Sequence, residues 1–330
     1  MEPIHILALE ATQNVGPKTI EKALSASSSF KPTNPSDLIK VLKKAREEHG
    51  WISVPDIQEV TAGWTKASEI WKISQTNNIR IISRFDRSYP KHLSKISDPP
   101  ALLHVLGNIN AIKRDCIAIV GTREPTKFGI NAARKLGALF AEKGYTVVSG
   151  LANGIDAAAH QGALDAKGLT VAILAHGLDT IYPAKNRKLA EAILRNSGAL
   201  VSEYPWGRKI SRNYFVARDR IQSGLSFGTF VVETGIEGGT MHTVRFCKDQ
   251  KRTLIVLKHP SEFIKYPQTF GNAELISKNH ADMVFEIDNI DWNKIEMKCF
   301  GNRFLVNRPS NAFSGSTSIL NKTLNSNEIK

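Results

Sequence analysis

The sequence is poor in cysteine and contains no long apolar run. Three cysteines stand far apart in 330 residues, without any C-x-x-C pair, at Cys116, Cys247 and Cys299. This pattern indicates neither a disulfide framework nor a zinc site and favours a reducing compartment, so we expect a cytoplasmic protein without bound metal. No stretch reaches the roughly 20 apolar residues of a membrane span, and the opening MEPIHILALE lacks the features of a secretory signal. We therefore expect no membrane association.

Acidic residues are also scarce relative to basic ones. The chain has 31 Asp and Glu residues against 44 Lys and Arg residues, which gives a formal net charge of +13. Such an excess favours a polyanionic partner, nucleic acid above all once a membrane is set aside. The hydrophobic fraction of 42% is large enough to build real cores, and the length suits two domains.

The spacing of apolar residues and the local composition divide the chain into three parts. Residues 1–105 are expected to form a small, mostly helical domain of the SAM or helix-hairpin-helix kind, with a connector. Within it, the turn in NVGPKT (14–19) could offer backbone amides to a phosphate or could be an ordinary helix-to-helix turn. Residues 106–288 are predicted to be a Rossmann-like α/β domain. Residues 289–330 are Ser/Asn-rich and are predicted to be a flexible tail.

Short apolar strands alternate with helical stretches in the second part. The strands expected are CIAIV, YTVVS, TVAIL, ALVSE, TFVVE, TLIVL and DMVFE. This alternation predicts βαβ units and a parallel sheet flanked by helices. Because ligands of such sheets bind beyond the carboxyl ends of the strands, the residues that follow each strand are the candidates for function.

Three of these strands run into glycine-containing turns that open a helix. Such turns let backbone amides and a helix N-terminus approach an anion. None has the G-x-G-x-x-G spacing of a dinucleotide fingerprint, and we expect no cofactor. Asp156 in the second turn is expected to cap its helix and His160 to be structural. The candidate phosphate-binding residues in the three turns are Gly121, Thr122, Arg123, Phe128, Gly129, Gly150, Gly154, Gly238, Gly239 and Thr240.

The order of motifs resembles the DNA-processing protein A (DprA/Smf) family. The motifs that carry the resemblance are GTREPTKFG, SGLANGIDAAAHQGAL, HGLDTIYPAKN, SEYPWG, RDRIQSGLS and VVETGIEGGTMHT. The resemblance implies a homodimeric protein that binds single-stranded DNA without sequence preference and loads it onto the RecA recombinase in natural transformation or recombination. It implies no catalytic reaction. By transfer, Lys185, Asn186, Arg218 and Arg220 would line the DNA site beside Arg123, and Phe128, Tyr182 and Phe215 could stack on bases or pack in the core.

The sequence departs from the family pattern in four places. Thr122 stands where the family has serine, which keeps the hydroxyl. Asp219 lies between Arg218 and Arg220 where the family has asparagine, and this carboxylate is expected to weaken DNA contact. Gly238-Gly239-Thr240 replaces Ser-Gly-Ser, which brings the loop closer to that of related nucleotide hydrolases. The winged-helix domain of many family members has no counterpart in the polar tail.

Two other functions remain open from the sequence. The first is a nucleotide phosphoribohydrolase resembling the Lonely Guy enzymes, in which the glycine loop at 235–240 would hold a 5′-phosphate and Glu233 or Glu237 would act on the ribose. The second is a nucleotide sensor that regulates a partner. Base release from AMP would favour the enzyme, and a nucleotide that raises the melting temperature would favour the sensor.

Overall fold

The computed structural model describes residues 1–27 and 31–301. The chain divides into two compact units, residues 1–291 and a second unit that begins at Trp292. In the second unit the structure describes helix α11 (Trp292–Phe300), which lies in the part predicted to be a flexible tail. The rest of that predicted tail, from 302 onward, lies outside the described residues.

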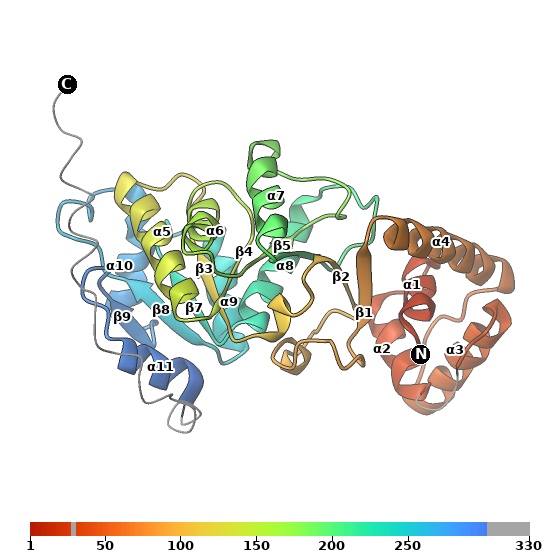
Figure 1. Cartoon of the computed structure of the whole chain (residues 1–330). Helices are drawn as coiled ribbons and strands as arrows, with labels where there is room; N and C mark the ends of the chain where they lie inside the picture. Colours follow the sequence, from red (N-terminus) through yellow and green to blue (C-terminus); the bar gives the residue numbers. More distant parts are fainter. Residues whose placement is uncertain (28–30, 302–330) are drawn as a thin grey trace. The chain divides into compact units, whose positions relative to one another are not determined.

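The first unit opens with four helices, drawn in red to brown in Figure 1: α1 (Pro3–Ala11), α2 (Pro17–Ala26), α3 (Pro35–His49) and α4 (Ile57–Thr76). Their starts follow from local sequence, because proline occupies the first turn of α1, α2 and α3, where its missing N–H costs nothing. At α4, the Asp56 carboxylate accepts hydrogen bonds from the backbone N–H groups of Gln58 and Glu59. Gly16 of the NVGPKT turn directly precedes α2.

A nine-stranded sheet forms the centre of the first unit. Its strand order is β1-β2-β6-β5-β4-β3-β7-β8-β9, and the seven strands from β3 to β9 are parallel. These seven confirm the predicted sheet: β3 (Cys116–Val120), β4 (Thr146–Ser149), β5 (Thr170–Leu174), β6 (Ala199–Ser202), β7 (Gly228–Val231), β8 (Thr253–Leu257) and β9 (Met283–Phe285). Every residue of β3 to β7 is buried, as expected for strands covered on both faces.

Two further strands lie in the region that we expected to be mostly helical. Strands β1 (Ile79–Ser83) and β2 (Leu102–Gly107) pair antiparallel, and β2 pairs antiparallel with β6. Strand β2 also crosses the predicted domain boundary at residue 105. The segments IRIIS and LLHVLG are mostly apolar runs too short for a helix; IRIIS gains its backbone hydrogen-bond partners from β2, and LLHVLG gains them from β1 and β6.

Two layers of helices cover the parallel strands. In one layer are α5 (Lys127–Glu142), α6 (Ile155–Asp165) and α7 (Arg187–Arg195), and in the other are α8 (Arg212–Leu225) and α9 (Thr240–Asp249) (Figure 1). Helix α10 (Phe270–Ser277) contacts β8. Four short 3-10 turns complete the unit: η1 (Leu93–Lys95), η2 (Ala111–Lys113), η3 (Ala184–Asn186) and η4 (Pro267–Thr269).

The strand order reverses between β3 and β7. The chain leaves β3 toward β4 through α5, whereas it leaves β7 toward β8 through α9 on the other face. The two connections therefore diverge at the carboxyl ends of these neighbouring strands and open a crevice there. This topological switch point is where open α/β sheets bind ligands.

Candidate functional site

A cavity of about 760 Å³ lies at the switch point between β3 and β7. Its walls come from the loop after β3, the loop after β7, the start of α6 and one face of α8. The structure thus brings together predicted residues from all along the domain: Gly121, Thr122, Arg123, Arg218, Gly238, Gly239 and Thr240.

Helix α8 contributes a stripe of side chains to this pocket. Arg212, Phe215, Asp219 and Gln222 all line it, and their spacing of three and four residues places them on one face of the helix. Arg212 and Gln222 were not among the residues predicted from the sequence. The signal that could have found them is this periodicity, counted in both directions from Phe215 and Asp219.

Two aromatic rings stand in the wall of the pocket. The ring centroids of Tyr182 and Phe215 are 5.8 Å apart, and Tyr182 is 44% exposed. The Arg123 guanidinium carbon lies 5.3 Å from the centroid of the Phe215 ring, within range of a cation–π contact. The pocket therefore combines accessible π-faces with a cation next to one of them.

Arg218 lies beneath the pocket and is only 4% exposed. Its Nη1 donates a hydrogen bond to the carbonyl of Ile173 at 2.7 Å, and its Nε is 3.3 Å from the Asp219 carboxylate. The guanidinium passes so close to Gly150 that a Cβ atom there would be 1.7 Å from Nη1. Gly150 therefore belongs to the support of Arg218 and does not line the cavity.

Two carboxyl groups share the floor of the pocket with Arg218. Burial raises the pKa of Asp219 to about 6, and the charge of Arg218 offsets only part of this effect. Burial also raises the pKa of Asp156, again against the influence of Arg218. The prediction that Asp156 caps α6 is wrong. Its carboxylate instead accepts hydrogen bonds from the N–H groups of Gly150 and Ala152, and thus fixes the loop before α6.

Exposed cations lie on the segments next to the pocket-lining residues Tyr182 and Ile210. The lining itself is balanced, since Arg123, Arg212 and Arg218 face Glu124, Asp156 and Asp219. On the segments next to Tyr182 and Ile210, exposed side chains without an ion pair or hydrogen bond among the described residues form what we call the basic rim: Lys185, Arg187, Lys188, Arg208 and Lys209. The two loops that carry the rim are joined by a hydrogen bond from the Gly177 N–H to the Arg208 carbonyl.

Arg220 does not line the pocket, although the sequence predicted it there. It follows Arg218 by two residues, which is more than half a turn of helix, and therefore points away. Its guanidinium pairs with Glu203 through two hydrogen bonds and contacts Asp98 at 2.9 Å. The side chain is 8% exposed and fixes α8 to the loops at 98 and 203.

Phe128 and Gly129, at the start of α5, do not line the pocket either, because Glu233 binds this end of the helix. Its fully buried carboxylate accepts hydrogen bonds from the N–H and hydroxyl of Thr126, at 2.8 and 2.6 Å. Gly129 packs directly on this carboxylate, where a Cβ atom would lie 2.3 Å from it. Phe128 turns the other way and stacks on Phe263, with 4.9 Å between ring centroids.

The other predicted residues have supporting positions. Asn186 is buried, and its side-chain amide donates hydrogen bonds to the carbonyls of Leu151 and Ala152. Lys185 belongs to the basic rim and is not part of the cavity wall. Gly154 has a φ of 76° and lies against Thr122, so that its left-handed conformation and close packing shape the second loop.

Two side chains of reactive type are buried away from the pocket. The His160 Nδ1 lies 2.6 Å from the Thr170 hydroxyl, which itself donates to the Val147 carbonyl, so His160 is the donor in the first bond. Burial lowers the pKa of His160 to about 3 and keeps the ring neutral. Cys116 is buried in β3, where burial raises the pKa of its thiol. Neither group faces a ligand site.

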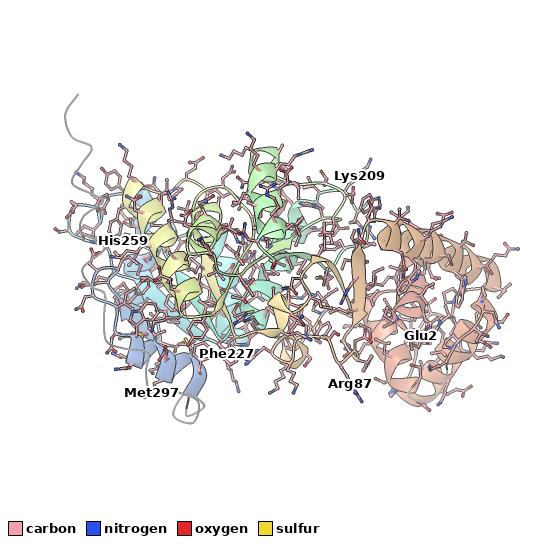
Figure 2. The ribbon with its side chains drawn as sticks, in the orientation of Figure 1. Glu2, Arg87, Lys209, Phe227, His259 and Met297 are labelled. Atoms are coloured by element: carbon pink, nitrogen blue, oxygen red, sulfur yellow. The ribbon has the colours of Figure 1, made fainter. Side chains whose placement is uncertain are left out.

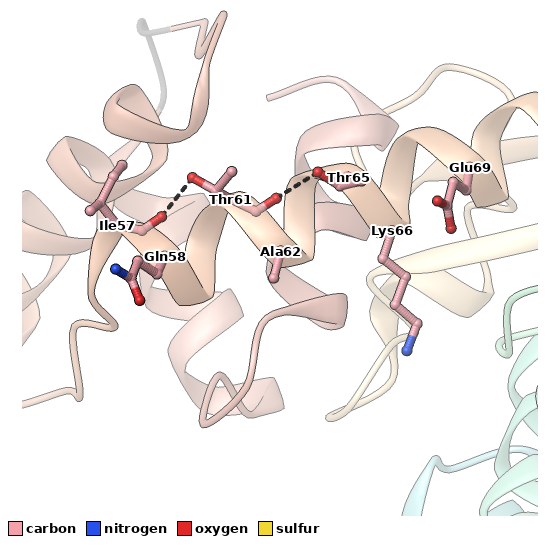
Figure 3. Close-up of a pocket in the computed structure, with 7 residues that line it drawn as sticks. All are labelled: Ile57, Gln58, Thr61, Ala62, Thr65, Lys66 and Glu69. Atoms are coloured by element: carbon pink, nitrogen blue, oxygen red, sulfur yellow. Dashed lines mark hydrogen bonds between the residues drawn. The ribbon is translucent and has the colours of Figure 1, made fainter.

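A second hollow runs along α4 (Figure 3). It is lined by Ile57, Gln58, Thr61, Ala62, Thr65, Lys66 and Glu69. The hydroxyls of Thr61 and Thr65 donate to backbone carbonyls one turn earlier, at 2.6 and 3.0 Å, and are thus already satisfied. The hollow collects no set of polar groups aimed at one point, so we place the functional site at the sheet edge.

Two other kinds of feature are absent from the described residues. In residues 1–27 and 31–301, no three His, Cys, Asp or Glu side chains gather as a metal site would require. Within the same ranges, none of the helices has the length and apolar character needed to cross a membrane.

The chain belongs to the family described as DNA recombination-mediator protein A, whose model matches residues 80–293, more than half of its length. Protein Smf of Escherichia coli K12 is 36% identical over 236 residues, which cover 72% of this chain and 61% of that protein. Protein Smf of Synechocystis is 39% identical over 187 residues, or 47% of its length. The chain thus matches about half to three fifths of these two relatives.

Solved structures agree with this assignment. DNA processing protein A from Streptococcus pneumoniae superimposes with a TM-score of 0.71 at 25% identity, over 87% of this chain and 96% of that one. The protein from Helicobacter pylori, whose structure describes a single-stranded DNA binding mode, superimposes with a TM-score of 0.59 at 26% identity. It covers 67% of this chain and 99% of that one. The family and the fold expected from the motifs are both confirmed.

Proposed function

We propose that this protein binds single-stranded DNA, without sequence preference, in the pocket between β3 and β7. The observation that carries the proposal is the grouping of Tyr182 and Phe215 with the Arg123 guanidinium in a pocket whose adjoining segments carry the basic rim. Rings stack on any unpaired base, and cations neutralise the phosphates between bases. The DNA binding described for the Helicobacter pylori relative supports the same assignment.

Different residues of the pocket would contact different parts of a bound strand. Arg123 from the loop after β3 and Arg212 from the start of α8 line the cavity and would contact phosphates, while the N-terminus of α9 at Gly239 and Thr240 adds backbone N–H groups. Arg218 is engaged with Ile173 and Asp219, and would act mainly through its charge. The five side chains of the basic rim would continue the interaction with the strand's backbone outside the pocket.

We propose further that the protein acts by binding and not by catalysis. In a phosphoribohydrolase, Glu233 would have to reach a ribose. Here its carboxylate is 0% exposed and both oxygens bind Thr126. Glu237 is exposed but is not part of the cavity wall. Release of free base from AMP by the purified protein would contradict this part of the proposal.

The first test is fluorescence-anisotropy binding of labelled oligo-dT to the wild-type protein, to Arg123→Ala and to a control, Arg134→Ala. Arg134 is an exposed arginine on α5 that pairs with Asp165, so the control removes the same charge away from the pocket. We expect salt-sensitive binding that Arg123→Ala weakens and Arg134→Ala preserves. The slope of log affinity against log salt should fall by about 0.7 for each phosphate that the variant no longer neutralises.

Oligo-dT binding that stays unchanged in Arg123→Ala, or that ignores salt, would refute the pocket as the DNA site. If no oligonucleotide binds, mononucleotides should be screened by thermal shift. A nucleotide that raises the melting temperature of the wild type but not of Arg123→Ala would identify the pocket as a sensor site instead.

We also propose that the bound strand is passed to a RecA-type recombinase by a homodimer, in transformation or recombination. The description of the family as a recombination mediator supports this role. The test is recombinase filament formation on an oligonucleotide coated with single-strand-binding protein, with and without this protein, together with its mass in solution by light scattering. Unchanged filament formation would contradict the transfer to a recombinase, and a monomeric mass at working concentration would contradict the homodimer.

A further inference from the structure

Three segments that are distant in sequence meet at the amino-terminal edge of the sheet, opposite the pocket. Arg252, just before β8, donates a hydrogen bond to the carbonyl of His92 at 2.9 Å. The His92 ring lies 3.8 Å from the ring of Phe227, and the Phe227 N–H bonds the carbonyl of Cys116, the first residue of β3. The turn around η1, the end of η2 and the end of α9 are therefore neighbours.

Each of these segments carries exposed cations. None of their charged groups forms a hydrogen bond or ion pair with another described residue, in contrast to Lys40, Arg134 or Lys258, which do. Exposed carboxylates at the same edge are fewer: Asp115, Glu142, Asp249 and Asp282. We call the set of cations the N-edge surface, and it consists of Lys91, Lys95, Lys113, Arg114, Lys248 and Lys251.

The N-edge surface is separate from the pocket. The parallel strands between the two edges have up to five residues, which corresponds to about 17 Å. This separation exceeds the Debye length of about 8 Å at physiological salt, so cations at one edge add little to the potential at the other. In Figure 2, Phe227 at the N-edge and Lys209 of the basic rim are labelled on opposite sides of the ribbon.

The two surfaces also differ in what they can recognise. The pocket offers accessible rings, which require unpaired bases. Two aromatic side chains at the N-edge, Phe227 and Tyr145, are 8% and 5% exposed and have no face free for stacking, and Phe246 near the end of α9 is half-buried. An exposed group of five lysines and one arginine, with no exposed aromatic ring in the set, suits the phosphates of a duplex, whose bases are already stacked and whose charge density is higher than that of a single strand.

We propose that the N-edge surface binds the phosphate backbone of duplex DNA, independently of the single-strand pocket. The protein then holds a duplex at one edge of its sheet and a single strand at the other, as it would at a junction between the two. The duplex contact needs no base readout and is independent of sequence.

The test compares two variants that each remove four exposed cations and lower the formal charge of +13 by the same amount. The N-edge variant combines Lys113→Ala, Arg114→Ala, Lys248→Ala and Lys251→Ala. The control variant combines Lys43→Ala, Arg46→Ala, Lys66→Ala and Lys72→Ala, which lie on α3 and α4 and have no ion pair among the described residues. Circular dichroism and melting temperature establish that both variants fold.

Anisotropy is measured with a blunt-ended duplex and, separately, with oligo-dT, over a series of salt concentrations. The N-edge variant should lose about tenfold or more in duplex affinity, with a salt slope lowered by up to about 0.9 per cation, and should keep oligo-dT binding. Arg123→Ala should keep duplex binding, and the control variant should keep both. The duplex result stands whether or not oligo-dT binds the pocket, so a failure here is distinct from a failure of the proposed function.

Three results would overturn the proposal. The first is a wild-type protein that binds no duplex at low salt. The second is an N-edge variant that binds the duplex as tightly as wild type. The third is an equal loss in the N-edge and control variants, which would assign duplex affinity to net charge instead of to this surface.

Discussion

The ionisation of Asp219 should cost this protein stability at neutral pH, and Asp219→Asn should recover it. The folded-state pKa of about 6 exceeds the ordinary value of 3.8 because the carboxyl is buried beside Asp156, with only partial compensation from Arg218 and Arg123. The folded protein therefore binds this proton more tightly than the unfolded chain. Its contribution to stability is largest below pH 4 and is lost as the pH rises to 6.

The size of the effect follows from the two pKa values. A difference of about two units corresponds to about 3 kcal/mol between the plateau below pH 4 and the plateau above pH 6. Asparagine keeps an oxygen for the hydrogen bond from the Gln222 amide, which is 3.2 Å long, and carries no charge to bury. The stability advantage of Asp219→Asn over wild type should therefore grow by about 1–3 kcal/mol across this range.

Urea unfolding of both proteins at a series of pH values between 4 and 7.5 measures this difference directly. Asp156 also has a raised pKa, but it is present in both proteins, so its own titration largely cancels in the comparison. A difference that stays constant with pH would refute the reasoning, because it would mean that the Arg218 ion pair fully compensates the burial of the carboxylate. If phosphate binds above this carboxylate, Asp219→Asn should also tighten oligo-dT binding at pH 7.5 more than at pH 5.

Three further changes test the packing of the site. Gly150→Ala should destabilise the fold by about 1–3 kcal/mol in thermal unfolding and weaken oligo-dT binding, because the new methyl displaces the Arg218 guanidinium; unchanged stability would contradict the observed contact. Arg220→Ala should cost about 3–5 kcal/mol of stability, since it leaves the Glu203 carboxylate partly buried without its partner. Oligo-dT affinity of the folded fraction should then change little, and a specific loss of affinity would return Arg220 to the DNA site. Phe215→Ala should weaken oligo-dT binding by about 1–3 kcal/mol in anisotropy titrations, and wild-type affinity would exclude base stacking there.

Much of the fold was predictable because its signals are local. A parallel strand covered on both faces is an apolar run, and all seven predicted runs are strands. Strands β1 and β2 escaped prediction because IRIIS and LLHVLG lie in a region of helical pattern, and their place in the sheet depends on the pairing of β2 with β6, about a hundred residues later. Pairing across such a distance leaves no local pattern.

The candidate site was predictable only in part, because some of its features depend on contacts between distant segments. A residue that follows a parallel strand is at the carboxyl edge of the sheet, and this places Thr122, Arg123 and the loop at 238–240 at the pocket. The direction of a side chain is different, because it depends on partners elsewhere in the chain. Arg220 turns toward Glu203 and Asp98.

The sequence by itself determined the set of parallel strands, the glycine turns at their ends and the family to which the chain belongs. Only the tertiary structure decided which arginine of the Arg218-Asp219-Arg220 segment faces the pocket, and that the Asp219 side chain, 14% exposed, lies at its floor. It also decided that the cations near residues 91, 113 and 251 lie on one surface. Burial and charge clustering arise from packing between distant segments, whereas strand formation depends on the run of apolar residues within one segment.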